Sequence, residues 1–452
     1  MSINALYQWQ CHPKSEALLM HTLQEYCNAN PFIAALQQEL LLKTSTRLFD
    51  WVDHLVVNFS SDFEQELESD GFVSEAATAS YRVLHHPRAQ LPRILMEDMG
   101  SPLQGIAVTV DSIADFLMVR GMSGLIEGTP LSNYRRCCVS TEEGVSLWVV
   151  ERRCGHSMEP TYTDSVAISR YLQGVEMWEI RPRSMEDEDE AMAFTLKIAQ
   201  QLINLVGEDL AAWIVLEVER KYWQARNTAA QLQKNRQDRL GMGWSNHDHH
   251  TFRSSRRHFG QLVRLFEMLG FTCRERFYAG NEAGWGAQVM EHAKTRLVLF
   301  LDVDLLPNEI EVDFRHQSLP ELQKHNTVGL WCALHGDSIL RAGMHHLEAQ
   351  FMFDDLTRDL LTVGVDMMEP FSDFPFLKQA FTKGEIWSVS PNRLEKLLRG
   401  GLITKEQADK FLTKGAIGSH MENLQRREGY KGFNQKNVSF IIQKTDPRNI
   451  NF

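Results

Sequence analysis

Apolar residues recur at three- and four-residue spacing near the beginning of the chain. The spacing covers residues 18–27 and 32–48, and it is typical of helices with one buried face. We therefore predict that residues 1–100 form a mainly helical N-terminal region that serves as packing scaffold.

The pattern becomes extended after residue 104, and the expected order is one strand, one helix and three strands (βαβββ). The expected elements are a strand at 105–110, a helix at 111–121, and strands at 134–140, 145–152 and 174–181. An acidic run at 185–190 then begins a helical stretch that ends near residue 239. Acidic side chains at such a place indicate a solvated helix start.

The same βαβββ order recurs twice in the rest of the chain. The second copy has strands at 249–253, 271–278, 286–291 and 296–303, a helix at 257–269 and a turn at 280–284. The third copy has strands at 344–352, 376–381 and 384–389 and a helix at 354–363, and helices at 393–399 and 405–414 follow it. Recurrence of one plan at intervals indicates an internally repeated fold.

The repeats predict an α+β fold in which paired βαβββ modules form a cupped sheet around a central cavity. We expect three regions: a helical region at 1–100, a degenerate metal-free module with helices at 101–240, and two metal-binding modules with a helical tail at 241–452. The module at 101–240 has no histidine at the start of its first strand. Glu176 or Glu179 could correspond to a ligand there, but a structural role is the stronger interpretation.

Composition narrows the classes of function. The chain has 452 residues, 43% hydrophobic and 23% charged, with a formal net charge of −12. This charge argues against a large nucleic-acid-binding surface. The seven cysteines include no CxxC pair, which argues against a structural zinc site and a disulfide framework. We expect a cytoplasmic protein, because the chain begins without a signal-peptide pattern and has no apolar run long enough to span a bilayer.

Metal chemistry is suggested by a stretch that holds three histidines and an aspartate at 247–250. Side chains alternate along a strand, so only part of this group can face one site. The repeat plan points to one histidine near 249, one within 343–348, and a carboxylate from a final strand, for which Glu385 is the candidate. Two histidines and one carboxylate are the ligand set of non-haem Fe(II) oxygenases.

Three segments resemble the 2-oxoadipate dioxygenase/decarboxylase (hydroxyglutarate synthase) family of the vicinal-oxygen-chelate superfamily, over roughly residues 245–400. The first is His249-His250-Thr251-Phe252-Arg253, together with the helix that ends at Gly270 and the segment Ala283-Gly284-Trp285-Gly286. The second is His346-Leu347-Glu348, and the third is 377–381 followed by Gly384-Glu385-Ile386. Where the family continues Thr-Pro-Arg after His-Leu, this chain has Glu348-Ala349-Gln350, which leaves the substrate open.

The resemblance implies Fe(II) ligands at His249, His346 and Glu385. It also implies that Arg253 acts in catalysis by holding a substrate carboxylate, with Lys378 and Gln379 as further substrate contacts. The implied partners are a 2-oxo acid and O₂, with neither nucleic acid nor membrane. His247 and His250 compete with His249 for the first position, and His345 competes with His346.

Two other functions fit the same residues. One is a Zn-, Ni- or Mn-dependent isomerase or lyase of the same superfamily, which would use the metal as a Lewis acid without O₂. The other is a metal-free ligand-binding module. Metal content and O₂ dependence would separate the three.

Overall fold

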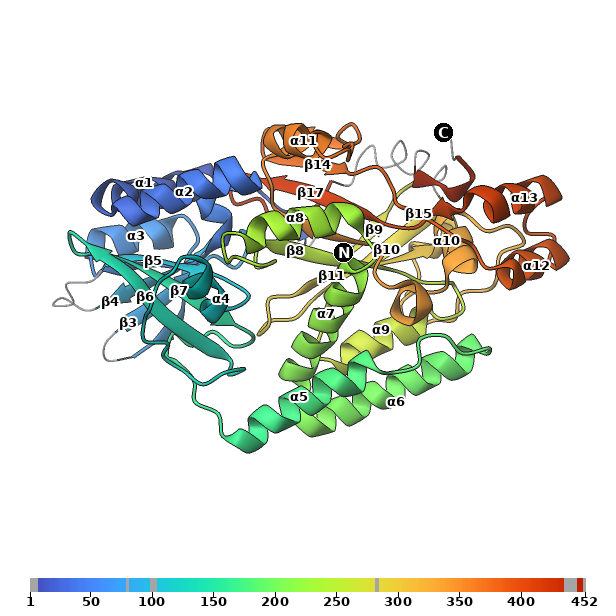
Figure 1. Ribbon diagram of the computed structural model, residues 1–452, viewed down its shortest axis with the longest axis horizontal. Coiled ribbons are helices and arrows are strands. Elements are labelled where there is room, and N and C mark those ends of the chain that lie inside the picture. The colour runs from blue at the N-terminus through green and yellow to red at the C-terminus, as the bar shows by residue number, and fades with distance from the viewer. Residues whose placement is uncertain (1–6, 79–80, 98–103, 281–283, 435–444, 450–452) are drawn as a thin grey trace.

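The computed structural model describes residues 7–78, 81–97, 104–280, 284–434 and 445–449. The predicted domain boundary at residue 100 and residues 281–283 of the predicted turn lie outside these ranges. Figure 1 shows strands at the two sides of the molecule, blue to cyan on the left and yellow to red on the right, with the green helices α7 (Glu208–Gln224) and α8 (Thr228–Asp238) between them.

The N-terminal region begins with the two helices that the apolar spacing predicts. These are α1 (Pro13–Ala29) and α2 (Pro31–Thr44). The helical prediction does not hold for the rest of 1–100, because residues 52–97 carry four strands. A continuous apolar run such as the one in β1 (Val52–Asn58) has no period that separates a buried strand from a buried helix.

Seven strands form the N-terminal sheet in the order β2-β3-β4-β1-β5-β7-β6. β1 and β5 pair antiparallel at its centre, and each has the last strand of its own module beside it in parallel. The first module is β1, α3 (Ser61–Ser69), β2 (Val73–Ala77), β3 (Tyr81–His85) and β4 (Arg93–Glu97). The second is β5 (Gln104–Thr109), α4 (Ile113–Val119), β6 (Tyr134–Glu142) and β7 (Val145–Arg152).

A helical layer joins the two sheets. It contains α5 (Ser165–Glu179), α6 (Glu188–Val206), α7 and α8. The predicted strand at 174–181 is wrong, because most of it forms the end of α5. Tyr171, Gly174 and Trp178 are buried on one face of that helix at three- and four-residue spacing.

Eight strands form the C-terminal sheet in the order β13-β14-β17-β12-β8-β11-β10-β9. β8 and β12 pair antiparallel at its centre, with β11 and β17 beside them in parallel. One module is β8 (His247–Arg253), α9 (Phe259–Met268), β9 (Thr272–Tyr278), β10 (Trp285–Glu291) and β11 (Val298–Asp304). The other is β12 (His346–Ala349), α11 (Phe353–Leu361), β13 (Ser372–Phe374), β14 (Leu377–Phe381) and β17 (His420–Arg426).

Two further segments of the C-terminal half lie outside the repeated βαβββ plan. The first segment contains the helix α10 (Thr327–His335), which lies between the two modules of the C-terminal sheet. The second lies inside the last module, before β17, and carries β15 (Ile386–Trp387), α12 (Pro391–Arg399), α13 (Lys405–Lys414) and β16 (Ala416–Ile417). β15 and β16 pair only with each other, in a separate two-stranded sheet. The predicted final strand at 384–389 is therefore not part of the main sheet.

The fold is α+β, as predicted, and within the described ranges it repeats the βαβββ plan four times, with one strand missing from the second copy. Two modules pair through their first strands in each sheet, in agreement with the predicted pairing of βαβββ modules. The sequence pattern predicts only three copies, because it assigns helices to residues 52–97, which form the first module of the structure. First and last strands of the C-terminal pair thus lie side by side at the centre of the sheet.

Candidate metal centre

The start of β8 is fixed by contacts with the N-terminal half of the chain. Gly243 has φ +66°, and a Cβ there would lie 2.1 Å from Asp111 Oδ2. Asp111 accepts hydrogen bonds from Trp244 N at 2.8 Å and from Ser245 Oγ at 3.0 Å. Glycine permits this close approach, and the strand then begins at His247 with its register set.

Alternation along three central strands directs four ionisable side chains to one face. His249 comes from β8, His346 and Glu348 from β12, and Glu422 from β17, where it stands beside Glu348 in the parallel register. All four are buried, with exposed fractions of 0–6%. The centre is therefore built from the first strands of both modules and the last strand of one.

The distances within this group are short. Glu348 Oε1 lies 2.7 Å from His249 Nε2 and 2.6 Å from His346 Nε2. Glu422 Oε2 lies 3.4 Å from His346 Nε2. Ligand atoms of His249, Glu348 and Glu422 lie within 4.8 Å of one another, close enough to hold a metal ion.

Burial shifts the pKa of all four side chains of this group. It raises the pKa of Glu422 to about 8, and it raises the pKa of Glu348 well above its ordinary value, with the neighbouring Glu422 adding to the effect. It lowers the pKa of His249 and His346. Neutral imidazoles keep a lone pair for a metal, and a buried divalent cation would favour the ionised carboxylates.

Neighbouring side chains hold the ligand atoms in orientation. His249 Nδ1 lies 3.1 Å from Asp248 Oδ1, and Arg426 Nε donates to Asp248 Oδ2 at 3.0 Å. The proton on Nδ1 leaves the Nε2 lone pair of His249 facing the centre. Thr251 Oγ1 donates to Glu348 Oε1 at 2.8 Å. Glu348 Oε2 is buried without a hydrogen-bond partner in the described part of the chain.

Two of the three competing histidines, His247 and His250, lie apart from this group. His250 points to the other face of β8, where Arg220 Nη1 is 3.2 Å from its Nε2. His247 contacts the His250 ring and lines a larger cavity of about 760 Å³. His345 precedes β12 and lies beside His346. The structure thus brings His249 and His346 together, as the resemblance implies.

Glu385 does not join the two histidines. Its Oε1 accepts a hydrogen bond from Thr228 N at 2.7 Å, at a partly exposed position just before β15. The physical reason is the insertion between β14 and β17, which moves the true final strand to residue 420. The sequence held one signal for this strand, since His346-Leu347-Glu348 and His420-Met421-Glu422 share a His-x-Glu pattern.

Arg253 lies on the same face of β8 as His249. It is 5% exposed, and its guanidinium stands 5.5 Å from the centre of the Trp331 ring. Arg253 Nε is 3.6 Å from Asp302 Oδ2, and Nη1 has no hydrogen-bond partner among the described residues. Burial raises the pKa of Asp302 to about 7. A guanidinium with an unused donor fits an anionic oxygen of a ligand.

A small cavity of about 70 Å³ joins the metal-ligand candidates to Arg253. Seven strands contribute to its wall, so the sheet curves around it. Its aromatic lining consists of Phe277, Trp285, Phe300, Phe371, Phe381 and Phe433. The polar part of the wall comprises the four ionisable ligand candidates, Arg253, Thr251, Gln379, Asp302, Asn434 and Thr445.

The two predicted substrate contacts on β14 face opposite ways. Gln379 lines the cavity, and its Nε2 donates to Glu422 Oε1 at 3.1 Å. Lys378 is not part of the cavity wall, because its Nζ lies 3.2 Å from Asp373 Oδ1 and above the Phe353 ring. The structure therefore gives Gln379 a place at the site and leaves Lys378 outside it.

Gln379→Leu and Lys378→Ala form a matched pair on one strand. Loss of the Gln379 amide should weaken metal affinity by roughly 10- to 100-fold, as removal of a ligand's hydrogen-bond partner usually does. Lys378→Ala should leave it unchanged. Metal titration of both variants measures the difference, and equal affinities would remove Gln379 from the centre.

Comparisons with known proteins add little to this geometry. No protein-family model and no curated protein matches the chain. A search of solved structures returns a mutant of 4-hydroxymandelate synthase from Streptomyces coelicolor (12% identity, 88% of this chain and 98% of that chain covered, TM-score 0.30). It also returns methylmalonyl-CoA epimerase from Mycobacterium tuberculosis (10% identity, 40% of this chain and 89% of that chain covered, TM-score 0.24).

A third structure in this search is a xylose isomerase-like TIM barrel/4-hydroxyphenylpyruvate dioxygenase fusion protein. It is 11% identical to this chain, the matched region covers 89% of this chain and 53% of the fusion protein, and the TM-score is 0.23. TM-scores this low carry no argument about activity. In addition, none of the helices in the described ranges is long and apolar enough to cross a membrane.

Proposed function

We propose that this protein is a non-haem Fe(II)-dependent dioxygenase that oxidatively decarboxylates and hydroxylates a 2-oxo acid. The observation that carries the proposal is the meeting of His249, His346 and Glu422 beside the unused donor of Arg253 in one aromatic cavity. Two imidazoles and one carboxylate suit Fe(II) and leave coordination positions for substrate and O₂. Glu422 takes the position for which the resemblance suggested Glu385.

The residues present fit an iron ion on chemical grounds. Burial lowers the pKa of both histidines and so favours their neutral form, and Asp248 directs the Nε2 lone pair of His249 toward the group. The buried Glu348 Oε2 has no hydrogen-bond partner among the described residues, and burial raises the pKa of Glu348 and of Glu422, an effect that a bound cation would offset. When bound, Fe(II) would supply O₂ activation and Lewis acidity.

The protein's own residues would bind and orient the substrate. Arg253 would hold a carboxylate through its free donor, since a guanidinium matches two carboxylate oxygens. The aromatic wall would exclude water from the reacting carbon. In the balanced reaction a 2-oxo acid and O₂ give CO₂ and a hydroxy acid one carbon shorter, so 2-oxoadipate would give 2-hydroxyglutarate.

A reducing compartment suits this chemistry. All seven cysteines are free in the structure. Together with the proposed ferrous centre, which a reducing compartment would protect, this supports our proposal of a cytoplasmic location. The proposed partners are the small 2-oxo acid and O₂, with neither nucleic acid nor membrane.

The test is protein reconstituted with Fe(II) under anaerobic conditions and then mixed with 2-oxoadipate and O₂. We expect O₂ uptake and CO₂ release in a one-to-one ratio. A matched sample loaded with Zn(II) should show neither. If the iron-loaded protein consumes no O₂ with 2-oxoadipate or with shorter and longer 2-oxo diacids, the proposal is wrong.

Metal binding by Glu348 would favour a second candidate function. If it also binds the ion, four protein ligands leave two positions of an octahedron, too few for a chelating 2-oxo acid plus O₂. Such a centre suits a Zn-, Ni- or Mn-dependent isomerase or lyase. Metal analysis of protein purified without added metal separates the two, because this alternative predicts another metal and activity without O₂.

A further inference from the structure

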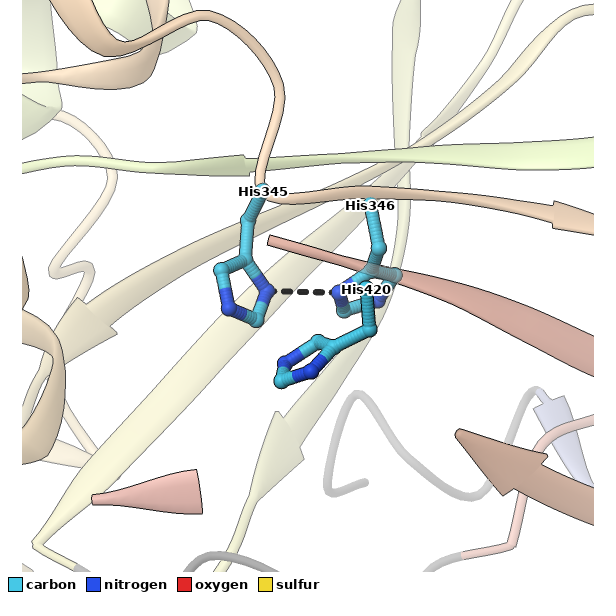
Figure 2. A group of neighbouring side chains, drawn as sticks. All are labelled: His345, His346 and His420. Carbon is cyan, nitrogen blue, oxygen red and sulfur yellow. Dashed lines mark hydrogen bonds between the residues drawn. The ribbon is translucent and has the colours of Figure 1, made fainter. Parts of the chain in front are cut away.

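Three histidines meet beside the proposed iron centre. His346 and His420 are the first residues of the parallel neighbours β12 and β17, and His345 directly precedes β12. Figure 2 shows the three rings turned toward one another. One nitrogen of each lies within 4.8 Å of the others.

Two of these three histidines, His345 and His420, are buried and have ring nitrogens without a hydrogen-bond partner in the described part of the chain. His345 and His420 are each 1% exposed. His345 Nε2 and both ring nitrogens of His420 have no hydrogen-bond partner in the part of the chain that the structure describes. The surrounding side chains are aromatic, with Trp331 against His345 and Phe381 stacked on His420. Buried polar atoms without partners are costly, so they point to a missing ligand.

His346 faces both groups. Its Nε2 lies 2.6 Å from Glu348 Oε1, on the side of the proposed iron. Its Nδ1 lies 2.5 Å from His345 Nδ1, on the side of the three histidines (Figure 2). One imidazole ring thus offers a different nitrogen to each of two adjacent groups.

We propose that His345, His346 and His420 form a second metal position, distinct from the iron centre and bridged to it by the His346 ring. Binding at both ring nitrogens of His346 releases the ring proton. The ring then joins the two positions as an imidazolate, since metal binding displaces the protons of its ligands. Three imidazole donors without a carboxylate favour Zn(II), Cu(II) or Ni(II) over Mg(II) or Mn(II).

This inference rests on the proposed function only through the shared His346. The experiment is a zinc titration of the full chain, followed by removal of unbound metal and counting of bound zinc. Wild-type protein should hold two zinc ions per chain. His420→Gln should hold one, and Glu348→Gln/Glu422→Gln should lose the ion of the other position. His335→Gln is the matched control, because His335 is buried nearby, bonds to Ile417 O, and should keep two.

A second readout tests the bridge and does not need any variant. Copper(II) at both positions should give an electron paramagnetic resonance spectrum of a coupled pair, because the imidazolate joins the two ions. Wild-type protein whose single zinc is kept by His420→Gln would overturn the proposal, as would His420→Gln that keeps two. Retention of both ions in the double glutamate variant would instead contradict the iron centre proposed above.

Discussion

Glu422→Gln is expected to weaken iron binding by more than about 100-fold, beyond the 10- to 100-fold typical of residues that only support a metal ligand. The substitution keeps the size of the side chain but removes the charge that complements a cation between β8, β12 and β17. O₂-dependent turnover should fall with the bound iron. Iron content after desalting and O₂ uptake at saturating 2-oxo acid measure the two effects.

Glu385→Gln is the control for this experiment. Glu385 lies outside the main sheet and bonds to the N-terminal backbone of α8, so this variant should keep both iron and activity. The reverse outcome, with Glu385→Gln inactive and Glu422→Gln active, would show that the sheet does not bring the ligands together as described.

Arg253→Gln is expected to lower kcat/KM for a 2-oxo diacid by roughly 100-fold or more, because removal of one partner of a buried charge pair costs about 2–5 kcal/mol. The iron content should stay near one ion per chain, since Arg253 contacts no ligand candidate by a hydrogen bond in the structure's described ranges. Steady-state kinetics and metal analysis of the same preparation separate substrate binding from metal binding.

Arg253→Lys refines this prediction. Lysine keeps the positive charge but loses the planar pair of donors, so its kcat/KM should fall between those of wild type and Arg253→Gln. An Arg253→Gln enzyme with wild-type kcat/KM would exclude Arg253 as the carboxylate anchor.

The sequence predicted the two histidines and the arginine of the site, because each lies on the first strand of a module whose following helix has a clear apolar period. The period of α9 and the strands on either side of it identified the module that begins with β8, which carries His249 and Arg253. His346 was found for the same reason, because β12 occupies the equivalent place in the next module. Alternation then put His249 and Arg253 on one face of β8, and the structure agrees.

The carboxylate could not be found in this way. Residues 382–419 interrupt the last module, and Ile386 and Trp387 form a short strand that resembles a final strand in sequence. Only pairing across the sheet distinguishes them, since β17 joins β12 and β15 joins β16. Long-range pairing leaves no trace in local periodicity, and for the same reason the helical prediction is wrong for the strands at 52–97.

The most direct test of the central claim is a crystal structure of iron-loaded protein with anomalous diffraction measured at the iron edge. We predict one strong peak between His249 Nε2, His346 Nε2 and the Glu422 carboxylate, within ligand distance of all three and facing Arg253 across the aromatic cavity. A peak at Glu385, or a fully loaded protein whose iron lies away from β8, β12 and β17, would contradict the account.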